Sequence, residues 1–244
     1  MDAVTIFLRE LAVFKRTIIK FMSSNLVSPL LYLTAFGWGL GHGMKMGGVT
    51  YLEFIIPGIV SLTSMGASFN GIATNLNISR IYFKTYEEVQ IAPVHPLSVA
   101  LGYIFTGAFR GLLASFLVLV VSFFFKVKLH LNLWFFLALF LTCFIFSGLG
   151  VFAAMIIETH EDLSNFSRFV IMPMTFLCGT FFTTDNLPSG VNAIIRILPL
   201  THSSKLMRMS ILKGEYSLFS FGVLMTYALI FFILAVVSIK KKGS

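Results

Sequence analysis

Charged residues are scarce in this chain. Only 11% of its 244 residues are Asp, Glu, Lys or Arg, whereas 57% are hydrophobic. A soluble domain normally carries about 25% charged residues, because its surface must be hydrated. The low charge excludes an ordinary soluble fold, and long apolar runs of the length needed to cross a hydrocarbon core about 30 Å thick recur along the sequence.

Cysteine is almost missing too. The two cysteines, Cys143 and Cys178, lie in apolar runs without a second ligand close in sequence, so they support neither a disulfide framework nor a metal centre. The apolar runs are continuous and do not alternate, which argues against a transmembrane barrel. Although the formal net charge is +8, most Lys and Arg residues stand at the ends of apolar runs, as in membrane proteins. We therefore expect no nucleic-acid partner.

Catalytic motifs are also missing. No glycine-rich loop ends in Lys-Ser or Lys-Thr to hold nucleotide phosphates. His160 lacks the second His of a zinc-protease helix, and Ser147 lacks the glycine two positions earlier of a nucleophile elbow. We predict that the chain is not an enzyme and holds no metal or cofactor itself. The rival interpretation, an intramembrane enzyme, would require a buried Ser-His or metal pair.

The apolar runs predict an all-α polytopic membrane protein that forms one transmembrane domain over residues 1–244. We predict six transmembrane helices, at residues 18–40, 54–76, 97–125, 131–157, 165–182 and 218–239. Basic residues flank the first, second and last spans and place both termini in the cytoplasm. If the fifth run did not cross, the count would be five and the Lys240 to Lys242 cluster would lie outside.

Two segments outside these spans have recognisable patterns. Residues 1–17 predict an amphipathic helix that lies on the cytoplasmic membrane surface, with Phe7 and Phe14 on one face and Arg9 and Arg16 on another. Between the fifth and last spans, the apolar piece 191–198 is bounded by prolines and is too short to cross. We expect a re-entrant hairpin there, buried by protein at its ends.

The second span has an unusual polar surface. Small and polar residues recur at helical spacing beside an apolar stripe, among them Ser64, Ser68, Asn70 and Asn75. Such a face either packs closely against other membrane helices or lines a polar route between them. Arg110, near the middle of the third span, needs a partner, because a cation there costs about 2.5 to 3.5 kcal/mol on insertion scales. Candidate partners are Asn70, Asn75, backbone carbonyls, water or an anionic substrate headgroup.

Aromatic residues mark two further places. Tyr32 and Phe36, near the end of the first span, could contact a passing sugar or lipid. The loop after the second span is too apolar for a solvated connector, because it carries Tyr82, Phe83, Tyr86 and Val89. This loop is either a docking helix or an interfacial helix that anchors its aromatic side chains in lipid headgroups.

Several short motifs, in order over almost the whole chain, resemble the type-2 ATP-binding cassette (ABC) export permeases, especially the bacterial multidrug-like and nodulation-factor-like members, which also include polysaccharide exporters. The motifs are Phe54-Ile-Ile-Pro-Gly-Ile, Tyr86-Glu-Glu-Val-Gln-Ile-Ala-Pro-Val, Gly102-Tyr with Arg110-Gly111, Met172-Pro173 with Cys178-Gly-Thr-Phe-Phe, Leu187-Pro188, and Leu198-Pro199-Leu200 up to Arg208.

The resemblance implies a role for each segment. Residues 1–17 would be a connecting helix, residues 183–200 the outer re-entrant hairpin, and residues 82–94 the coupling helix that seats in a separate ATPase subunit. The implied ATPase-coupling residues are Tyr82, Phe83, Tyr86, Glu87, Glu88 and Val89. Two ATPase copies would carry the ATP and Mg, and a second permease copy or a close paralogue would complete a dimer in the inner membrane of a prokaryote.

The sequence therefore predicts the permease subunit of an ATP-driven exporter. Candidate residues for the substrate path or for helix packing are Tyr32, Phe36, Ser64, Ser68, Asn70, Asn75 and Arg110. An apolar lining with a few Ser, Thr and Asn residues suits drug-like, lipid, lipid-linked glycan and polysaccharide substrates alike. The alternative is an ATP-independent secondary transporter or channel, which would need paired intramembrane carboxylates or internal repeats.

Overall fold

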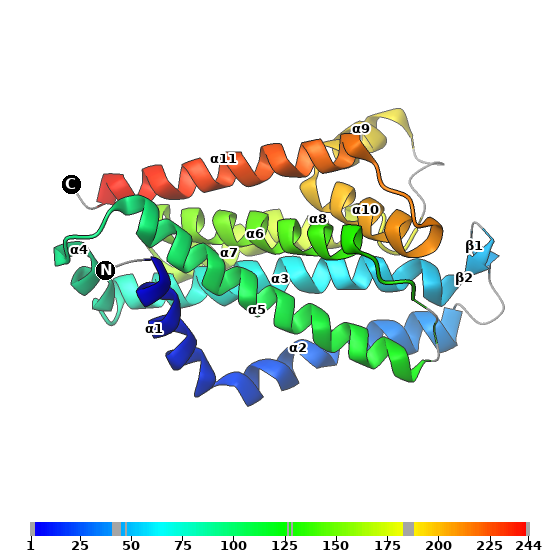
Figure 1. Cartoon of the computed structure of the whole chain (residues 1–244), viewed down its shortest axis with the longest axis horizontal. Helices are drawn as coiled ribbons and strands as arrows, with labels where there is room; N and C mark the ends of the chain where they lie inside the picture. Colours follow the sequence, from blue (N-terminus) through cyan, green and yellow to red (C-terminus); the bar gives the residue numbers. More distant parts are fainter. Residues whose placement is uncertain are drawn as a thin grey trace.

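The computed structural model of the chain describes residues 3–40, 45–46, 48–125, 127, 129–182 and 188–242. The molecule is an elongated bundle of helices (Figure 1). Both ends of the chain lie at the end of the bundle that carries α4 (Thr85–Ile91), which we call the α4 end. The opposite end carries the short antiparallel hairpin of β1 (Lys45–Met46) and β2 (Val49–Thr50).

In the described part of the chain, four helices are long and apolar enough to cross a membrane: α3 (Tyr51–Ile81), α5 (Pro96–Phe124), α6 (Leu133–Ile156) and α11 (Leu218–Lys242). They correspond to the second, third, fourth and sixth predicted spans. α3 is the central helix, because it packs along both α5 and α6, and α11 packs on α6. The prediction of an all-α polytopic membrane protein is therefore confirmed.

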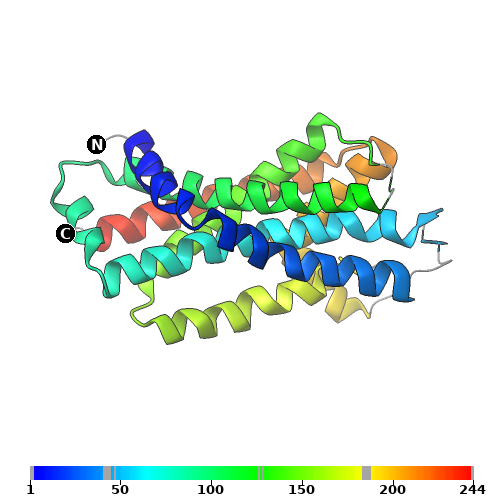
Figure 2. The ribbon, with the colours of Figure 1, turned by 90° about the horizontal axis from the view of Figure 1, so that it is seen from below.

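The first and fifth predicted spans are built from shorter pieces. α2 (Ile18–Tyr32) continues into the π-helix η1 (Leu33–Leu40). In the same way α7 (His160–Phe166) continues through the π-helix η2 (Ser167–Ile171) into α8 (Met172–Leu177). Each series follows the long axis of the bundle (Figure 2), although no single piece has the length of a span. Pro29 lies within α2 and removes one backbone donor there.

α1 (Ala3–Lys15) packs against the first half of α5 and then meets α2 in a V shape (Figure 1). Ile6 and Phe14 are the buried residues of α1. The close approach to α5 depends on Gly102, because a Cβ atom there would lie 2.8 Å from the Ile6 side chain. α1 is thus held against the bundle along one face.

The expected re-entrant segment contains two helices. α9 (Ser189–Ile197) follows Pro188, and α10 (Pro199–Lys213) begins at the next proline, as the two prolines predict. Residues 183–187 of the predicted 183–200 hairpin lie outside the described residues. α10 extends well beyond the predicted boundary and packs against α3, α6 and α11. The sequence did not indicate this second helix, because its polar and basic residues obscure an apolar face.

Candidate functional site

The helix α4 has two faces. Tyr86 is 3% exposed and Val89 is 7% exposed, and both belong to the apolar cluster that includes Tyr103 of α5 and Ile239 of α11. Burial raises the pKa of the Tyr86 hydroxyl to about 12. These two predicted coupling residues therefore attach α4 to its own bundle and do not point outward.

The outer side of α4 and of the residues just before it is open. In α4, Ile91 is 85% exposed and the side chain of Glu87 is exposed as well, and Tyr82 and Phe83, which directly precede the helix, are 66% and 72% exposed. Large apolar side chains at such exposure form a surface that is suited to a partner or to lipid headgroups. Ile91 was not among the predicted coupling residues, although its place at the end of the apolar loop was a usable signal.

Glu88, the remaining predicted coupling residue, contacts α1. Its Oε2 atom accepts a hydrogen bond from the Nη2 of Arg9 at 3.3 Å. This ion pair joins the N-terminal helix to α4. Glu88 is thus paired with a residue of its own chain, whereas the side chain of Glu87 beside it is exposed.

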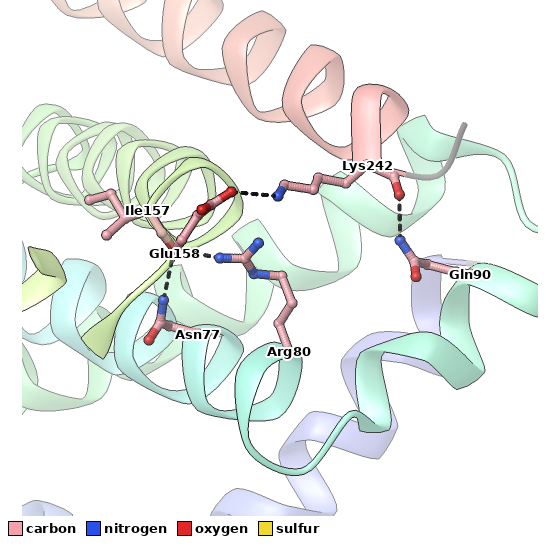
Figure 3. Close-up of polar contacts among 6 residues, drawn as sticks. All are labelled: Asn77, Arg80, Gln90, Ile157, Glu158 and Lys242. Carbon is pink, nitrogen blue, oxygen red and sulfur yellow. Dashed lines mark hydrogen bonds and ion pairs between the residues drawn. The ribbon is translucent and has the colours of Figure 1, made fainter. Parts of the chain in front are cut away.

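A second set of polar contacts joins the α3 and α6 ends of the bundle, next to α4 (Figure 3). The carbonyl oxygen of Ile157, just after α6, accepts hydrogen bonds from the Nδ2 of Asn77 at 3.2 Å and from the Nη2 of Arg80. Both donors lie in the last turns of α3. The end of α6 is therefore fixed to the end of α3, directly before the chain enters α4.

The last turn of α11 joins the same group. The Nζ of Lys242 lies 3.6 Å from the Oε1 of Glu158, and the main-chain oxygen of Lys242 accepts a hydrogen bond from Gln90 of α4 at 2.7 Å (Figure 3). We call this group of six residues the α4-end clasp. Its members are Asn77, Arg80, Gln90, Ile157, Glu158 and Lys242. Sequence analysis missed the clasp, because its contacts connect residues up to 152 positions apart.

A groove of about 640 Å³ runs between α2 and α3 and reaches Thr175 of α8. Four predicted path residues line it: Tyr32, Asn70, Asn75 and Arg110. Thr63, Ala67 and Thr74 of α3 line it as well, at the helical spacing that sequence analysis noted. One polar face of α3 is therefore open to a groove.

The three other predicted path residues lie elsewhere. Ser64 and Ser68 are fully buried, and they face α5 where Gly111 allows close approach. Phe36 stacks on Phe181 with ring centroids 4.8 Å apart, and Tyr32 lies 5.3 Å from the same ring. The two serines therefore belong to helix packing, whereas Phe36 belongs to an aromatic cluster beside Tyr32.

Arg110 forms a hydrogen bond with the backbone of α3. Its Nη1 donates to the carbonyl oxygen of Gly71 in α3, and its guanidinium carbon lies 4.8 Å from the centre of the Phe14 ring. The side chain of Asn75 donates to the same carbonyl at 2.7 Å. Of the candidate partners, a backbone carbonyl is thus the direct one, and an aromatic ring adds a cation–π contact that sequence analysis did not include.

Arg208 of α10 is a half-buried cation, which sequence analysis did not single out. It donates to the carbonyl oxygens of Phe54 at 3.1 Å and Gly179 at 3.0 Å, and it lies 3.8 Å from the centre of the Phe54 ring. Arg208 therefore joins α10, the start of α3 and the segment after α8 at the opposite end. Its only sequence signal was its position at the end of the recognised motif series.

No group of three or more His, Cys, Asp and Glu side chains in the described part of the chain comes close enough together to hold a metal ion. Cys143 and Cys178 are both buried, and neither forms a disulfide. The chemistry of the groove therefore rests on hydroxyl, amide and guanidinium groups, which can bind and orient a molecule by hydrogen bonds and charge.

A bundle of membrane helices with a lateral polar groove, and with exposed apolar side chains around a short helix at one end, is the architecture expected of a membrane transport protein. The chain belongs to the ABC-2 type transporter family, whose sequence signature matches residues 2–212. The resemblance on which the sequence analysis relied is therefore confirmed at the level of the family.

Individual relatives align over nearly the full chain. The inner membrane transport permease YadH of Escherichia coli (strain K12) is 27% identical over 235 residues, covering 94% of this chain and 91% of the relative. Nodulation protein J of Rhizobium meliloti (strain 1021) is 28% identical over 246 residues, covering 98% and 93%. Nodulation protein J of Bradyrhizobium diazoefficiens is 23% identical over 248 residues.

Proposed function

We propose that this chain is the membrane subunit of an ATP-driven exporter in a prokaryotic inner membrane, and that a separate ATPase subunit docks on α4. The observation that carries the proposal is the two-faced structure of α4 together with the exposed residues just before it. Tyr86 and Val89 hold the helix against the bundle, while Tyr82, Phe83 and Ile91 are exposed beside Glu87. Family membership supports the proposal, because it accounts for a permease without a nucleotide-binding motif.

The remaining architecture of the proposal follows the composite helices. We take α2 with η1 and α7 with η2 and α8 as the first and fifth of six spans, since each series has the length of its predicted run and follows the bundle axis. An even number of spans agrees with both chain ends lying at the α4 end. This end would face the cytoplasm, where Lys240, Lys241 and Lys242 favour it.

The groove along α3 is the proposed substrate path. It is lateral and open, so one copy of the chain does not enclose it, and two copies facing each other would do so. In the proposed cycle, ATP-driven closure of two ATPase subunits displaces α4. The α4-end clasp passes this displacement to α11, α6 and α3 as rigid bodies. It joins α4 to α11, α11 to Glu158 after α6, and the neighbouring Ile157 to α3.

Recovery of the ATPase with the purified chain tests the docking step. A tagged chain extracted from its native membrane should bring an ABC ATPase with it, identified by mass spectrometry. Glu87→Lys combined with Phe83→Ser should lower that recovery at least about tenfold, because it places unpaired charge and removes an apolar contact at a docking surface. Glu215→Lys, the same charge change at an exposed position after α10, is the control.

Normal recovery of the ATPase with the double variant would contradict the docking assignment, and the exposed aromatics just before α4 would then serve lipid headgroups. A purified chain that moves substrate across a vesicle membrane without any ATPase would support the secondary transporter instead. Orientation is tested separately with single cysteines at Ser189 and Lys241, after replacement of Cys143 and Cys178. Labelling of both positions from the same side would contradict the six-span arrangement.

A further inference from the structure

The charge of the groove has one sign. Among the described residues, its lining contains Lys20 of α2 and Arg110 of α5 and no Asp or Glu. The remaining polar lining consists of Ser, Thr and Asn side chains and the hydroxyl of Tyr32, which donate or accept hydrogen bonds without charge. A cationic molecule would find no counter-charge in this groove, whereas an oxyanion would find two cations.

The guanidinium of Arg110 is not saturated with partners. The side chain is only 4% exposed and has five N–H donors. Its Nη1 donates to Gly71, an acceptor that it shares with Asn75, and its Nε has no hydrogen-bond partner among the described residues. Arg110 also lines the open groove, and a guanidinium in such a position is the group that recognises planar oxyanions.

One carboxylate interacts with Arg110 from outside the groove. Glu10 of α1 interacts electrostatically with Arg110, but it is absent from the groove lining. Among the described residues, the groove side of Arg110 therefore carries no carboxylate that would compete with an anionic ligand.

The groove is long and has both polar and apolar lining. It follows α3 from Leu62 to Asn75, about 20 Å at the rise of an α-helix. Arg110 contacts α3 at Gly71, near one end, and apolar side chains continue along the groove to Tyr32 and Leu62 at the other. A cation beside an extended, partly apolar surface matches a molecule with a charged head and an apolar body.

We propose that the groove selects amphiphiles with an anionic phosphate, sulfate or carboxylate headgroup, which binds between Arg110 and Lys20 while the apolar part follows Leu62 and Tyr32. This inference rests on the proposed function, because it assigns the substrate class of the same path. It separates lipid-like anions from the cationic drug-like molecules that the sequence alone left open.

Native mass spectrometry of the purified chain in detergent tests the proposal with lipids that share their acyl chains. The probes are dioleoyl phosphatidic acid, dioleoyl phosphatidylcholine and a dioleoyl trimethylammonium lipid. Phosphatidic acid should bind at least about tenfold more tightly than the other two, as expected for charge-assisted hydrogen bonds. Equal binding of all three lipids would overturn the proposal, and so would equally tight binding of inorganic phosphate alone.

Three variants locate the effect. Lys20→Gln should reduce the preference for phosphatidic acid several-fold, and Arg110→Lys should reduce it further, because an ammonium lacks the planar fork of donors. The matched control is Lys15→Gln, which removes the same charge from an exposed lysine outside the groove. If Lys15→Gln lost the preference for phosphatidic acid equally, the lipid would be adsorbing to the basic surface, and binding in the groove would be refuted.

A second copy of the chain is the competing occupant. Cysteines at Asn70 and Thr74 would crosslink between copies if two grooves closed on each other without a ligand between them. Such crosslinking that persists at saturating phosphatidic acid would overturn the proposal. The lipid measurement needs no ATPase, so a lost headgroup preference with normal ATPase recovery would refute this inference and leave the proposed function standing.

Discussion

Arg9 of α1 and Glu88 of α4 form an ion pair with 3.3 Å between Nη2 and Oε2. Their side chains are 35% and 69% exposed, so the pair contributes about 1 kcal/mol or less to stability. Its importance is geometric. It fixes the position of α1 relative to the helix on which the ATPase is proposed to dock, and α1 in turn packs against α5.

The first prediction concerns this pair. Arg9→Glu alone should leave the free energy of unfolding within about 1 kcal/mol of the wild type but lower substrate-stimulated ATP hydrolysis by the assembled complex. The charge swap, Arg9→Glu with Glu88→Arg, should recover most of the hydrolysis, because the pair forms again in reverse. If the swapped variant hydrolysed no better than the single one, the pair would not position α4.

The second prediction concerns the carbonyl of Ile157. Arg80→Ala should lower the free energy of unfolding by about 1 to 3 kcal/mol. The substitution removes a charged donor, and the carbonyl oxygen of Ile157 then accepts a hydrogen bond from Asn77 only. Thermal unfolding of the purified chain measures the change. Gln90→Ala, which removes an exposed hydrogen bond of the same clasp, should cost less. A larger loss of stability with Gln90→Ala than with Arg80→Ala would contradict this prediction.

Much of the helical fold could be predicted from the sequence, because hydrocarbon thickness and apolar length fix where a chain can cross. The four long helices follow from this argument. The two composite series of helices overlap the runs predicted as the first and fifth spans, but their π-helical segments were not predicted, because the periodicity of the sequence does not indicate them. α10 was missed because Lys205 and Arg208 lower its apolar character, although Leu206 and Met207 beside them are buried.

The groove could be predicted only in part. The spacing of Asn70 and Asn75 identified a polar face of α3, and both residues line the groove. Spacing alone did not separate them from Ser64 and Ser68, which pack against α5. Which side of α3 a neighbouring helix covers depends on the tertiary structure and cannot be seen in the spacing. For the same reason the loop composition did not distinguish the inward Tyr86 from the outward Tyr82.

The third prediction tests the packing of α3 on α5. Gly111→Ala should destabilise the protein by about 1 to 3 kcal/mol, because its Cβ would lie 2.9 Å from the Sγ of Cys143 and 3.0 Å from the backbone oxygen of Ser64. Gly222→Ala, whose Cβ would have no atom within 4 Å, should be neutral or stabilising. Equal unfolding temperatures for the two variants would contradict the close contact.

The fourth prediction concerns pH. Because burial is the main cause that raises the pKa of Glu10 above its ordinary value of 4.5, the folded protein binds this proton more tightly than the unfolded chain does. The Glu10 contribution to stability is therefore present below pH 4.5 and declines as the pH rises from there through the folded pKa. Glu10→Gln should flatten this part of the unfolding profile. A profile identical to that of the wild type would contradict the burial effect.

The last prediction concerns Arg208, which connects three segments at the opposite end. Arg208→Ala would leave the carbonyl oxygens of Phe54 and Gly179 without a charged donor and remove the contact with the Phe54 ring, so it should lower the free energy of unfolding by a few kcal/mol, about 2 to 4. Arg208→Lys should recover less than half of this loss, because one ammonium cannot reproduce donors from two guanidinium nitrogens in fixed directions.

The control is Arg196→Ala on α9, since Arg196 makes an exposed hydrogen bond to Asn192 and its loss should stay within about 0.5 kcal/mol. Thiol labelling of a cysteine at Ser189 gives a second readout that stability alone does not provide. If Arg208 holds α10 and the segment after α8 against α3, both Arg208 variants should label faster than the Arg196 variant. Full stability and unchanged labelling of Arg208→Ala would show that apolar packing of Leu206 and Met207 holds this end without the cation.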